Sequence, residues 1–329
     1  MTTPSRHRPA FGLLAAGLLV VWLILQRGQF SAALARNAGF IAFNHIQAAA
    51  PDVAGESLQT GIARLERAAS GDHGRPSTWR ALGYLQLMRG AEEDALAAWR
   101  HSAAMPAELL ARGKTAEKAG DLDAALLWYL RATRVAPAGA EGWWRAGLVH
   151  EARGEPDDAL ALYEAGARAA PDNGDLPYRQ AWLMSRAPDS ADWAAVLSLT
   201  DRAIARGHFL SDRNALQAHT LRAESLRQLG REAEALAEYA WVIERQPDNY
   251  WAVLRYGELT WRLEGDLDES VRLLERAIEL DGANKWGYIA LARVYDAAGR
   301  RDEAARLFND VLALDTNDQT ANAWFKQRP

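Results

Sequence analysis

A short glycine-centred motif recurs through this chain at a nearly constant spacing. Each copy begins with Gly, continues with Asp, Arg or Glu, and has a small residue five positions after the Gly. The copies are GDLDAA from Gly120, GEPDDA from Gly154, GREAEA from Gly230, GDLDES from Gly265 and GRRDEA from Gly299. A period of about 34 residues predicts a stack of small helical units. We therefore expect the 329 residues to form mainly one elongated body with a continuous core.

The segment after each Gly repeats a small-large-small order at helical spacing. The first small position holds Ala125, Ala159, Ala235, Ser270 and Ala304, the large position holds Tyr129, Tyr163, Tyr239, Leu274 and Phe308, and the second small position holds Ala132, Gly166, Val242, Ala277 and Val311. This order lets a second helix press closely on a first, with the large side chain filling the space between them. Pro137, Pro171 and Pro247 end that helix at matching places.

A further helical segment precedes each turn and carries its own marks. These are Trp79-x-x-Leu82-Gly83, Trp143-x-x-Ala146-Gly147 and Tyr288-x-x-Leu291-Ala292-x-x-Tyr295. With them the chain resembles the tetratricopeptide repeat family, whose pattern is W-x2-L-G-x2-Y followed by A-x3-F, A and P. The match runs from about Pro76 to Thr316. It implies an all-α fold, a right-handed superhelix (α-solenoid) of about six to seven helix-turn-helix repeats.

Several units depart from this pattern, and they define the expected ends of the array. The period stretches between residues 172 and 211, where Asp175–Arg186 and Trp193–Arg206 form a helical pair without a Gly turn. The unit that begins at Gly90 is a few residues short. We expect the array to cover residues 56–316, beginning with a lone second helix, and residues 317–329 to form a C-terminal cap, because repeat arrays need atypical ends.

The N-terminus contains the apolar run FGLLAAGLLVVWLIL over residues 11–25. Its length lies between a signal-peptide core of ~7–15 residues and a spanning helix of ~17–25. We expect a cytoplasmic segment at 1–10, an uncleaved transmembrane signal-anchor at 11–27 in the lipid bilayer, and a connecting helix at 28–55. A cleaved signal peptide and a buried helix remain open alternatives. Arg6 and Arg8 precede the run, so the positive-inside rule puts the array on the exported, periplasmic or extracellular, side.

Composition excludes several classes of function. The formal net charge is −5 and the Arg residues alternate with acidic ones, so no basic block exists for nucleic acid. The chain has no Cys, which rules out disulfides and thiolate metal sites. Gly113-Lys114-Thr115 lacks the earlier Gly of a phosphate-binding loop, and His150-Glu151 lacks the second His of a zinc protease. We expect no enzymatic activity and no cofactor.

The acidic residues near the turns do not predict a metal site. Asp121 and Asp123, like Asp266 and Asp268, stand at the start of a helix, where a carboxylate satisfies free amide groups and complements the helix dipole. No calcium-binding loop with its internal Gly follows them. We therefore interpret them as helix caps.

The resemblance implies that the first helices of the repeats line a concave groove that binds a partner. The predicted groove residues are Arg80, Tyr84, Lys114, Glu117, Trp144, Glu151, Glu224, Arg227, Trp251, Glu258, Trp261, Arg262, Trp286, Arg293 and Asp296. Trp251, Trp261 and Trp286 either form an exposed aromatic wall beside Arg262 and Arg293, or pack between repeats. Both interpretations stay open from the sequence. The Lys and Asn residues of a clamp for peptide C-termini are missing, apart from Lys114.

The pattern as a whole resembles membrane-anchored bacterial members of the family. It predicts a non-enzymatic scaffold that mediates protein–protein interaction and recruits or assembles an envelope complex, for example in polysaccharide export. The expected partner is an integral membrane or envelope protein. The alternative is an exported glycan-binding module that stacks sugars on a Trp-rich groove, with polysaccharide as the ligand.

Overall fold

The computed structural model describes residues 35, 54–71, 75–186 and 191–327. The predicted cytoplasmic segment (1–10), the signal-anchor (11–27) and nearly all of the connecting helix (28–55) lie outside these ranges. Within the described ranges, no helix combines the length and the apolar character that crossing a bilayer requires.

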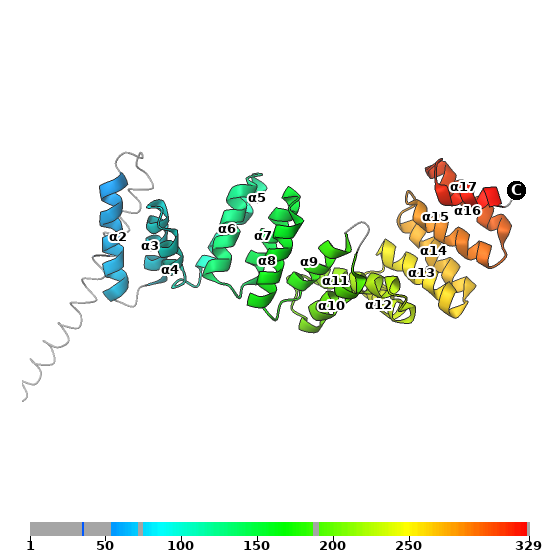
Figure 1. The fold of residues 1–329 in the computed structure, drawn as a ribbon, viewed down its shortest axis with the longest axis horizontal. Helices are drawn as coiled ribbons and strands as arrows, with labels where there is room; N and C mark the ends of the chain where they lie inside the picture. Colours follow the sequence, from blue (N-terminus) through cyan, green and yellow to red (C-terminus); the bar gives the residue numbers. More distant parts are fainter. Residues whose placement is uncertain (1–34, 36–53, 72–74, 187–190, 328–329) are drawn as a thin grey trace, which may run out of the picture. The chain divides into compact units, whose positions relative to one another are not determined.

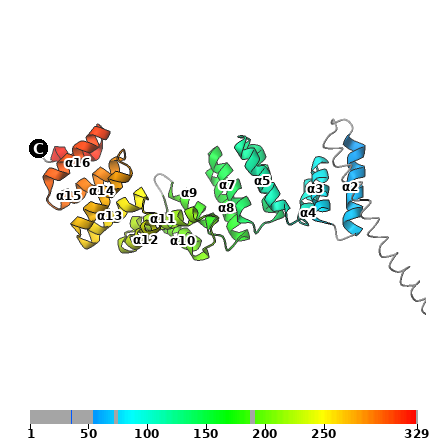
Figure 2. The same cartoon turned by 180° about the vertical axis from the view of Figure 1, so that it is seen from behind.

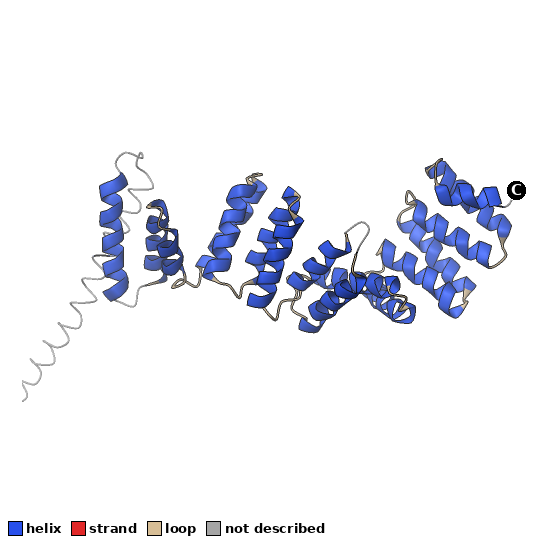
Figure 3. Cartoon of the chain, viewed as in Figure 1, coloured by secondary structure: helices blue, strands red, loops and turns tan. Residues whose placement is uncertain are grey.

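The described residues form helices joined by short turns (Figure 3). Sixteen helices follow one another in these ranges, and the one strand-like feature there is an isolated bridge between Asn173 and His208. The helices are α2 (Ala54–Gly71), α3 (Pro76–Met88), α4 (Glu92–Trp99), α5 (Met105–Lys118), α6 (Leu122–Val135), α7 (Ala140–Arg153), α8 (Pro156–Ala169), α9 (Asp175–Ser185), α10 (Trp193–Arg206), α11 (Asp212–Gln228), α12 (Glu232–Arg245), α13 (Tyr250–Glu264), α14 (Leu267–Leu280), α15 (Lys285–Ala297), α16 (Arg301–Leu314) and α17 (Gln319–Gln327).

The chain divides into two compact units rather than the single body that the repeat period predicts. The first unit ends at Val149 and the second begins at His150, so the boundary falls within α7. In each unit, consecutive helices pair as first and second helices of a repeat, as α5 and α6 or α13 and α14 do (Figures 1 and 2). The right-handed superhelix stays a prediction.

The first unit is held by apolar contacts between successive helices. Leu58, Ile62 and Leu65 of α2 pack with Leu82 and Leu85 of α3. A neighbouring cluster joins α4 and α5 to α6 through the side chains Trp99, Met105, Leu109 and Ala132. Each helix thus buries one apolar face against the next element.

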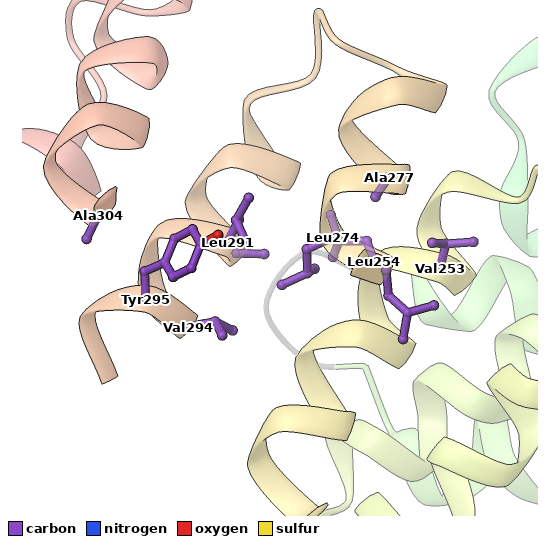
Figure 4. Close-up of a cluster of buried hydrophobic side chains, with 10 residues drawn as sticks. Val253, Leu254, Leu274, Ala277, Leu291, Val294, Tyr295 and Ala304 are labelled. Atoms are coloured by element: carbon purple, nitrogen blue, oxygen red, sulfur yellow. The ribbon is translucent and has the colours of Figure 1, made fainter. Parts of the chain in front are cut away.

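The second unit repeats this arrangement from α8 onward. In its largest described cluster, Leu254 of α13, Leu274 of α14 and Leu291 of α15 lie side by side (Figure 4). Phe308 and Val311 of α16 pack against Ala321 of α17, which covers the last repeat. A terminal helix of this kind shields apolar surface that would otherwise face water.

The glycine at each repeat turn has a backbone conformation that other residues rarely adopt. Gly90, Gly120, Gly154, Gly230, Gly265 and Gly299 have φ between +69° and +82°. At the turn after α5, the Gly120 N–H donates to the Glu117 carbonyl at 3.0 Å and the Asp121 N–H to the Ala116 carbonyl at 2.9 Å. These two hydrogen bonds satisfy backbone carbonyls in the last turn of the helix. The recurring Gly is therefore explained by the chain reversal.

The small-large-small order packs as the sequence predicts. The first small residue is fully buried in every copy, and the large one is at most 1% exposed. In the repeats that begin with α3 and α5, the first helix carries a Gly opposite the large residue: a Cβ at Gly83 would lie 2.2 Å from the Trp99 ring, and one at Gly113 would lie 2.3 Å from the Tyr129 ring. The two helices of a repeat approach closely because these positions lack a side chain.

The stretched repeat is α9 and α10, and a buried carboxylate organises it in place of a Gly turn. Asp175, at the start of α9, is fully buried and accepts hydrogen bonds from the Leu210 N–H at 2.8 Å and the Asn214 side chain at 2.5 Å. The Gly174 N–H donates to the His208 carbonyl at 2.8 Å. The segment after α10 is thereby fixed against the start of α9.

We predict that Gly113→Ala destabilises the protein more than Gly120→Ala. The first change forces a methyl group into the buried Tyr129 ring and should cost roughly 1–3 kcal/mol or more. The second has nothing within 4 Å of the new Cβ and should cost about 1 kcal/mol through its positive φ alone. Urea unfolding followed by circular dichroism gives both values. An equal or smaller effect at Gly113 would show that the α5–α6 contact is described wrongly.

Candidate binding surface

A pocket opens between the first helices of consecutive repeats in the second unit. It has a volume of about 530 Å³. Helices α9, α11 and α13 supply most of its lining, and α12 supplies one residue. The lining consists of Tyr178, Trp182, Ser185, Gln217, Thr220, Leu221, Glu224, Tyr239, Asn249, Trp251 and Arg255. Ligand sites are usually concave and lined by apolar and aromatic groups with a few placed polar atoms, as here.

Two tyrosine hydroxyls fix the polar side chains of this pocket. The Tyr178 hydroxyl donates to Gln217 Oε1 at 3.0 Å and so links α9 to α11. The Tyr239 hydroxyl donates to Glu224 Oε2 at 3.0 Å and links α12 to α11. Both tyrosine rings are almost fully buried, so they hold these acceptors in fixed positions.

The charged groups of the pocket are paired along their own helices. Arg227 donates to both carboxylate oxygens of Glu224, at 2.6 and 2.9 Å, and Arg255 donates to Glu258 at 2.7 Å. Burial raises the pKa of Glu224, but hydrogen bonds from Arg227, Gln228 and Tyr239 outweigh it and hold the pKa below the usual 4.5. Glu224 is therefore a carboxylate at neutral pH, and its charge is matched by Arg227.

Two tryptophans line the pocket and keep part of their surface exposed. The Trp182 ring stacks with two guanidinium groups, that of Arg179 at 4.1 Å and that of Arg186, just after α9, at 4.7 Å from the ring centre. Trp251 stands in the first turn of α13 and remains 45% exposed, with Tyr250 edge-on at 5.0 Å. A large ring that keeps nearly half its surface open is a common anchor for a bound partner.

A hydrogen bond from tyrosine to glutamate recurs between the helices of three repeats. Tyr129 donates to Glu117 in the first unit, where Arg145 also contacts that carboxylate at 3.4 Å. In the second unit Tyr163 donates to Glu151, and Arg179 binds the same carboxylate at 2.5 Å. This hydrogen bond was not predicted from the sequence, although a Glu stands twelve residues before the Tyr in both copies.

The predicted groove residues of the first unit are mostly engaged in ion pairs. Arg80 contacts Glu108 at 2.9 Å and Lys114 contacts Glu141 at 2.8 Å. The prediction for Tyr84 needs correction, because its ring is buried against Trp99 and only 9% of the residue is exposed. Trp144 is half-buried, and its indole N–H has no partner among the described residues.

The predicted groove residues of the second unit separate into two groups. The structure brings Glu224 and Trp251 together in the pocket lining. Arg227 and Glu258 stand outside the lining and form ion pairs with the lining residues Glu224 and Arg255. The other predicted residues of this unit, none of which belongs to the lining, are Glu151, Trp261, Arg262, Trp286, Arg293 and Asp296.

The three predicted tryptophans do not share one environment. Trp261 is half-buried and packs against the core cluster of α13–α16, which favours the packing interpretation for this ring. Trp286 is 45% exposed on α15, and Arg262 is paired with Glu232 of α12. Of the predicted aromatic wall, Trp251 is the member that lines the pocket.

One group of side chains within the described ranges could reach a common metal ion. Oxygen and nitrogen atoms of His150, Glu155 and Asp158 lie within 4.8 Å of one another. Glu155 and Asp158 stand at the start of α8, where the helix dipole favours carboxylates without a metal. His150 Nδ1 and Glu155 already interact at 2.7 Å. We therefore interpret these side chains as polar contacts at the start of α8.

From the hydrogen bonds between tyrosine and glutamate we predict that the protein loses stability at alkaline pH. Burial, together with the negative charge of Glu224 and the hydrogen bond to it, raises the pKa of Tyr239 above its usual 10.0. The stability from this protonated hydroxyl is complete below about pH 10 and is lost as the pH rises further. The free energy of unfolding should therefore fall above about pH 10, and less steeply in Tyr239→Phe. Urea unfolding between about pH 8 and pH 11 tests this; identical slopes in the two proteins would contradict it.

Comparison with known proteins places these features in a family. Two models described as tetratricopeptide repeat match the chain, one over residues 262–323 and the other over 110–174 and 220–285. Together the matches span just over half of the sequence. A search of curated proteins finds no match.

Solved structures share the fold at low sequence identity. PilF of Pseudomonas aeruginosa superimposes with a TM-score of 0.56 at 12% identity, covering 68% of this chain and 98% of PilF. PilW, described as a widely conserved type IV pilus biogenesis factor, gives 0.52 at 13% identity, covering 67% of this chain and 98% of PilW. YrrB, described as having an unusual peptide-binding site, gives 0.52 at 15% identity, covering 60% of this chain and 97% of YrrB.

The family matches agree with two features of the structure. These are the repeated Gly turn and the paired helices whose small and large residues interlock. This chain belongs to the tetratricopeptide repeat family, whose domains bind protein partners.

Proposed function

We propose that this protein is a membrane-anchored scaffold that binds an extended segment of a partner protein between α9, α11 and α13. The pocket in the second unit carries this proposal. It joins first helices of three consecutive repeats, so a segment lying along it contacts several repeats at once. Each repeat then contributes a small part of the binding energy, as in other helical repeat proteins.

The chemistry of the pocket suits a peptide segment. Trp182 and Trp251 offer apolar surface for side chains, while Gln217 and Asn249 are amides that can bond to a backbone. The charged groups present are already paired, so a bound segment does not have to separate them. A partly exposed tryptophan beside paired polar groups is a common composition of an interface hot spot.

The membrane anchor is supported by the sequence. The run at residues 11–25 is uncharged and apolar, with basic residues before and after it. Anchoring confines the groove to the membrane surface and raises the effective concentration of a partner there. A modest affinity of the groove for its partner is then enough to keep the partner bound at the membrane.

Our hypothesis for the setting is the assembly of an envelope complex, with the repeats on the exported side. The likeness to PilW, which is described as a pilus biogenesis factor, agrees with such a setting but concerns the fold alone at 13% identity. Polysaccharide export is a second possible setting. A partner that is itself a membrane or envelope protein would be held close to the bilayer in either case.

We predict that the full-length chain stays with the membrane pellet after alkaline carbonate extraction. A variant that lacks residues 1–27 keeps the repeats and should appear in the supernatant, because it lacks the apolar run that we expect to anchor the full-length chain in the bilayer. Release of the full-length chain at alkaline pH would contradict an uncleaved anchor. Mass determination of the purified protein separates that outcome from cleavage of a signal peptide.

We predict that a photoreactive benzoylphenylalanine in place of Trp251 captures a protein in native membranes. The matched control replaces Ala237, an exposed residue of the second helix α12 outside the pocket lining. Adducts that form only from position 251 are expected, because that ring faces the groove. Equal adducts from both positions, or adducts from position 237 alone, would place the interface elsewhere. Circular dichroism of both variants checks that they are folded.

A further inference from the structure

The walls of the pocket are unusually rich in aromatic rings. Tyr178 and Trp182 come from α9, Tyr239 from α12 and Trp251 from α13. The two tyrosines are buried and fixed by their hydroxyl hydrogen bonds, whereas the two tryptophans expose part of their surface. Aromatic walls favour a ligand that presents flat, apolar surface.

The charges of the pocket disfavour an ionised anchor. The Glu224 carboxylate accepts from Nε and Nη2 of Arg227, and Arg255 donates to the Glu258 carboxylate. A charged side chain or a C-terminal carboxylate would have to break one of these half-buried pairs, which costs more than separating exposed charges. Charge complementarity therefore selects an uncharged ligand at this place.

The carboxylate and the amide oxygens of the pocket already accept hydrogen bonds from the protein. Glu224 accepts from Arg227, Gln228 and Tyr239. Gln217 Oε1 accepts from Tyr178, and Asn249 Oδ1 accepts from the Ala252 N–H at 3.1 Å. The neutral hydroxyls of Ser185 and Thr220 are left as acceptors, so a ligand rich in N–H or O–H groups finds no free charged acceptor in the lining.

Several donors of the pocket make no hydrogen bond to a described residue. They are the indole N–H groups of Trp182 and Trp251, the side-chain amide of Gln217 and the guanidinium N–H groups of Arg255 other than the one that donates to Glu258. The pocket thus presents donors beside aromatic surface, and its complement is a chain of carbonyl oxygens beside apolar rings.

We propose that the pocket binds a proline-rich segment of the partner in the polyproline II conformation. Proline has an apolar ring for the aromatic walls, a free carbonyl for the open donors, and no backbone N–H that would need an acceptor. The polyproline II helix has no internal hydrogen bonds and is largely formed before binding, so little order is lost. This inference rests on the proposed function, because it names the kind of segment that the groove binds.

A sugar ring also stacks on tryptophan, but its chemistry fits less well. Each hydroxyl is a donor as well as an acceptor, and the Glu224 carboxylate, the one charged acceptor of the lining, already accepts from Arg227, Gln228 and Tyr239. A neutral oligosaccharide is therefore the competing ligand that the experiment must include.

The test is calorimetric titration of the full-length chain in detergent with an acetylated, amidated peptide of six prolines. Six residues in this conformation span about 19 Å, which limits the contacts to the pocket region. The control peptide has alternate prolines replaced by alanine, which restores N–H groups and removes rings. We expect the control to bind at least about tenfold more weakly.

Variants of the protein assign the binding to the pocket. Trp251→Ala removes the open ring, and Gln217→Glu replaces the free amide donor while keeping an acceptor for Tyr178. Each should weaken the six-proline peptide at least about fivefold. Trp286→Ala is the matched control, because that ring is equally exposed in the first turn of α15 but outside the lining. It should change the affinity less than about twofold.

Three results would overturn the proposal. The proline peptide does not bind at millimolar concentration, the alanine control binds equally well, or a neutral oligosaccharide binds and the proline peptide does not. The photocapture experiment keeps the two proposals apart. Capture at position 251 without binding of the proline peptide rejects the proline preference and leaves the scaffold intact. Absence of both rejects the groove itself.

Discussion

The fold depends on one contact that recurs along the repeats: a large side chain of the second helix packs where the first helix carries only a Gly or an Ala. The Tyr129 ring lies where a Cβ on Gly113 would stand, and the Trp99 ring does the same opposite Gly83. Because both partners are fully buried, neither can change size without moving a helix. This contact fixes the distance between the helices of a repeat, and the Gly turn fixes their reversal.

The same contact organises the candidate site. Since the second helices use their large residues for packing, the hydroxyl of a tyrosine at that position emerges beside the first helix and fixes a carboxylate there. Tyr239 does so with Glu224, and both line the pocket. Stability and recognition therefore share residues in this protein. Leu274 and Phe308 fill the same position without a hydroxyl, so their repeats lack this device.

The repeat pattern predicted the regular part of the fold well, because one short-range rule governs each copy. It also predicted helices at 175–186 and 193–206, where the structure has α9 (Asp175–Ser185) and α10 (Trp193–Arg206). The pocket was only partly predictable. Tyr178 and Trp182 lie on the irregular α9, which has no Gly turn to set the alignment, and Gln217 is recognised only through its contact with α9. Trp251 and Trp261 share α13, but neighbouring helices decide which is covered.

Hydrogen–deuterium exchange of the full-length chain, alone and with its captured partner, tests the central claim most directly. If the groove of the second unit holds the partner, exchange should slow in peptides from α9, α11 and α13, which carry most of the pocket lining. The second helices α10 and α14, outside the lining, should show little change. Protection confined to those second helices, or to the first unit, would contradict the account and place the interface on another face of the repeats.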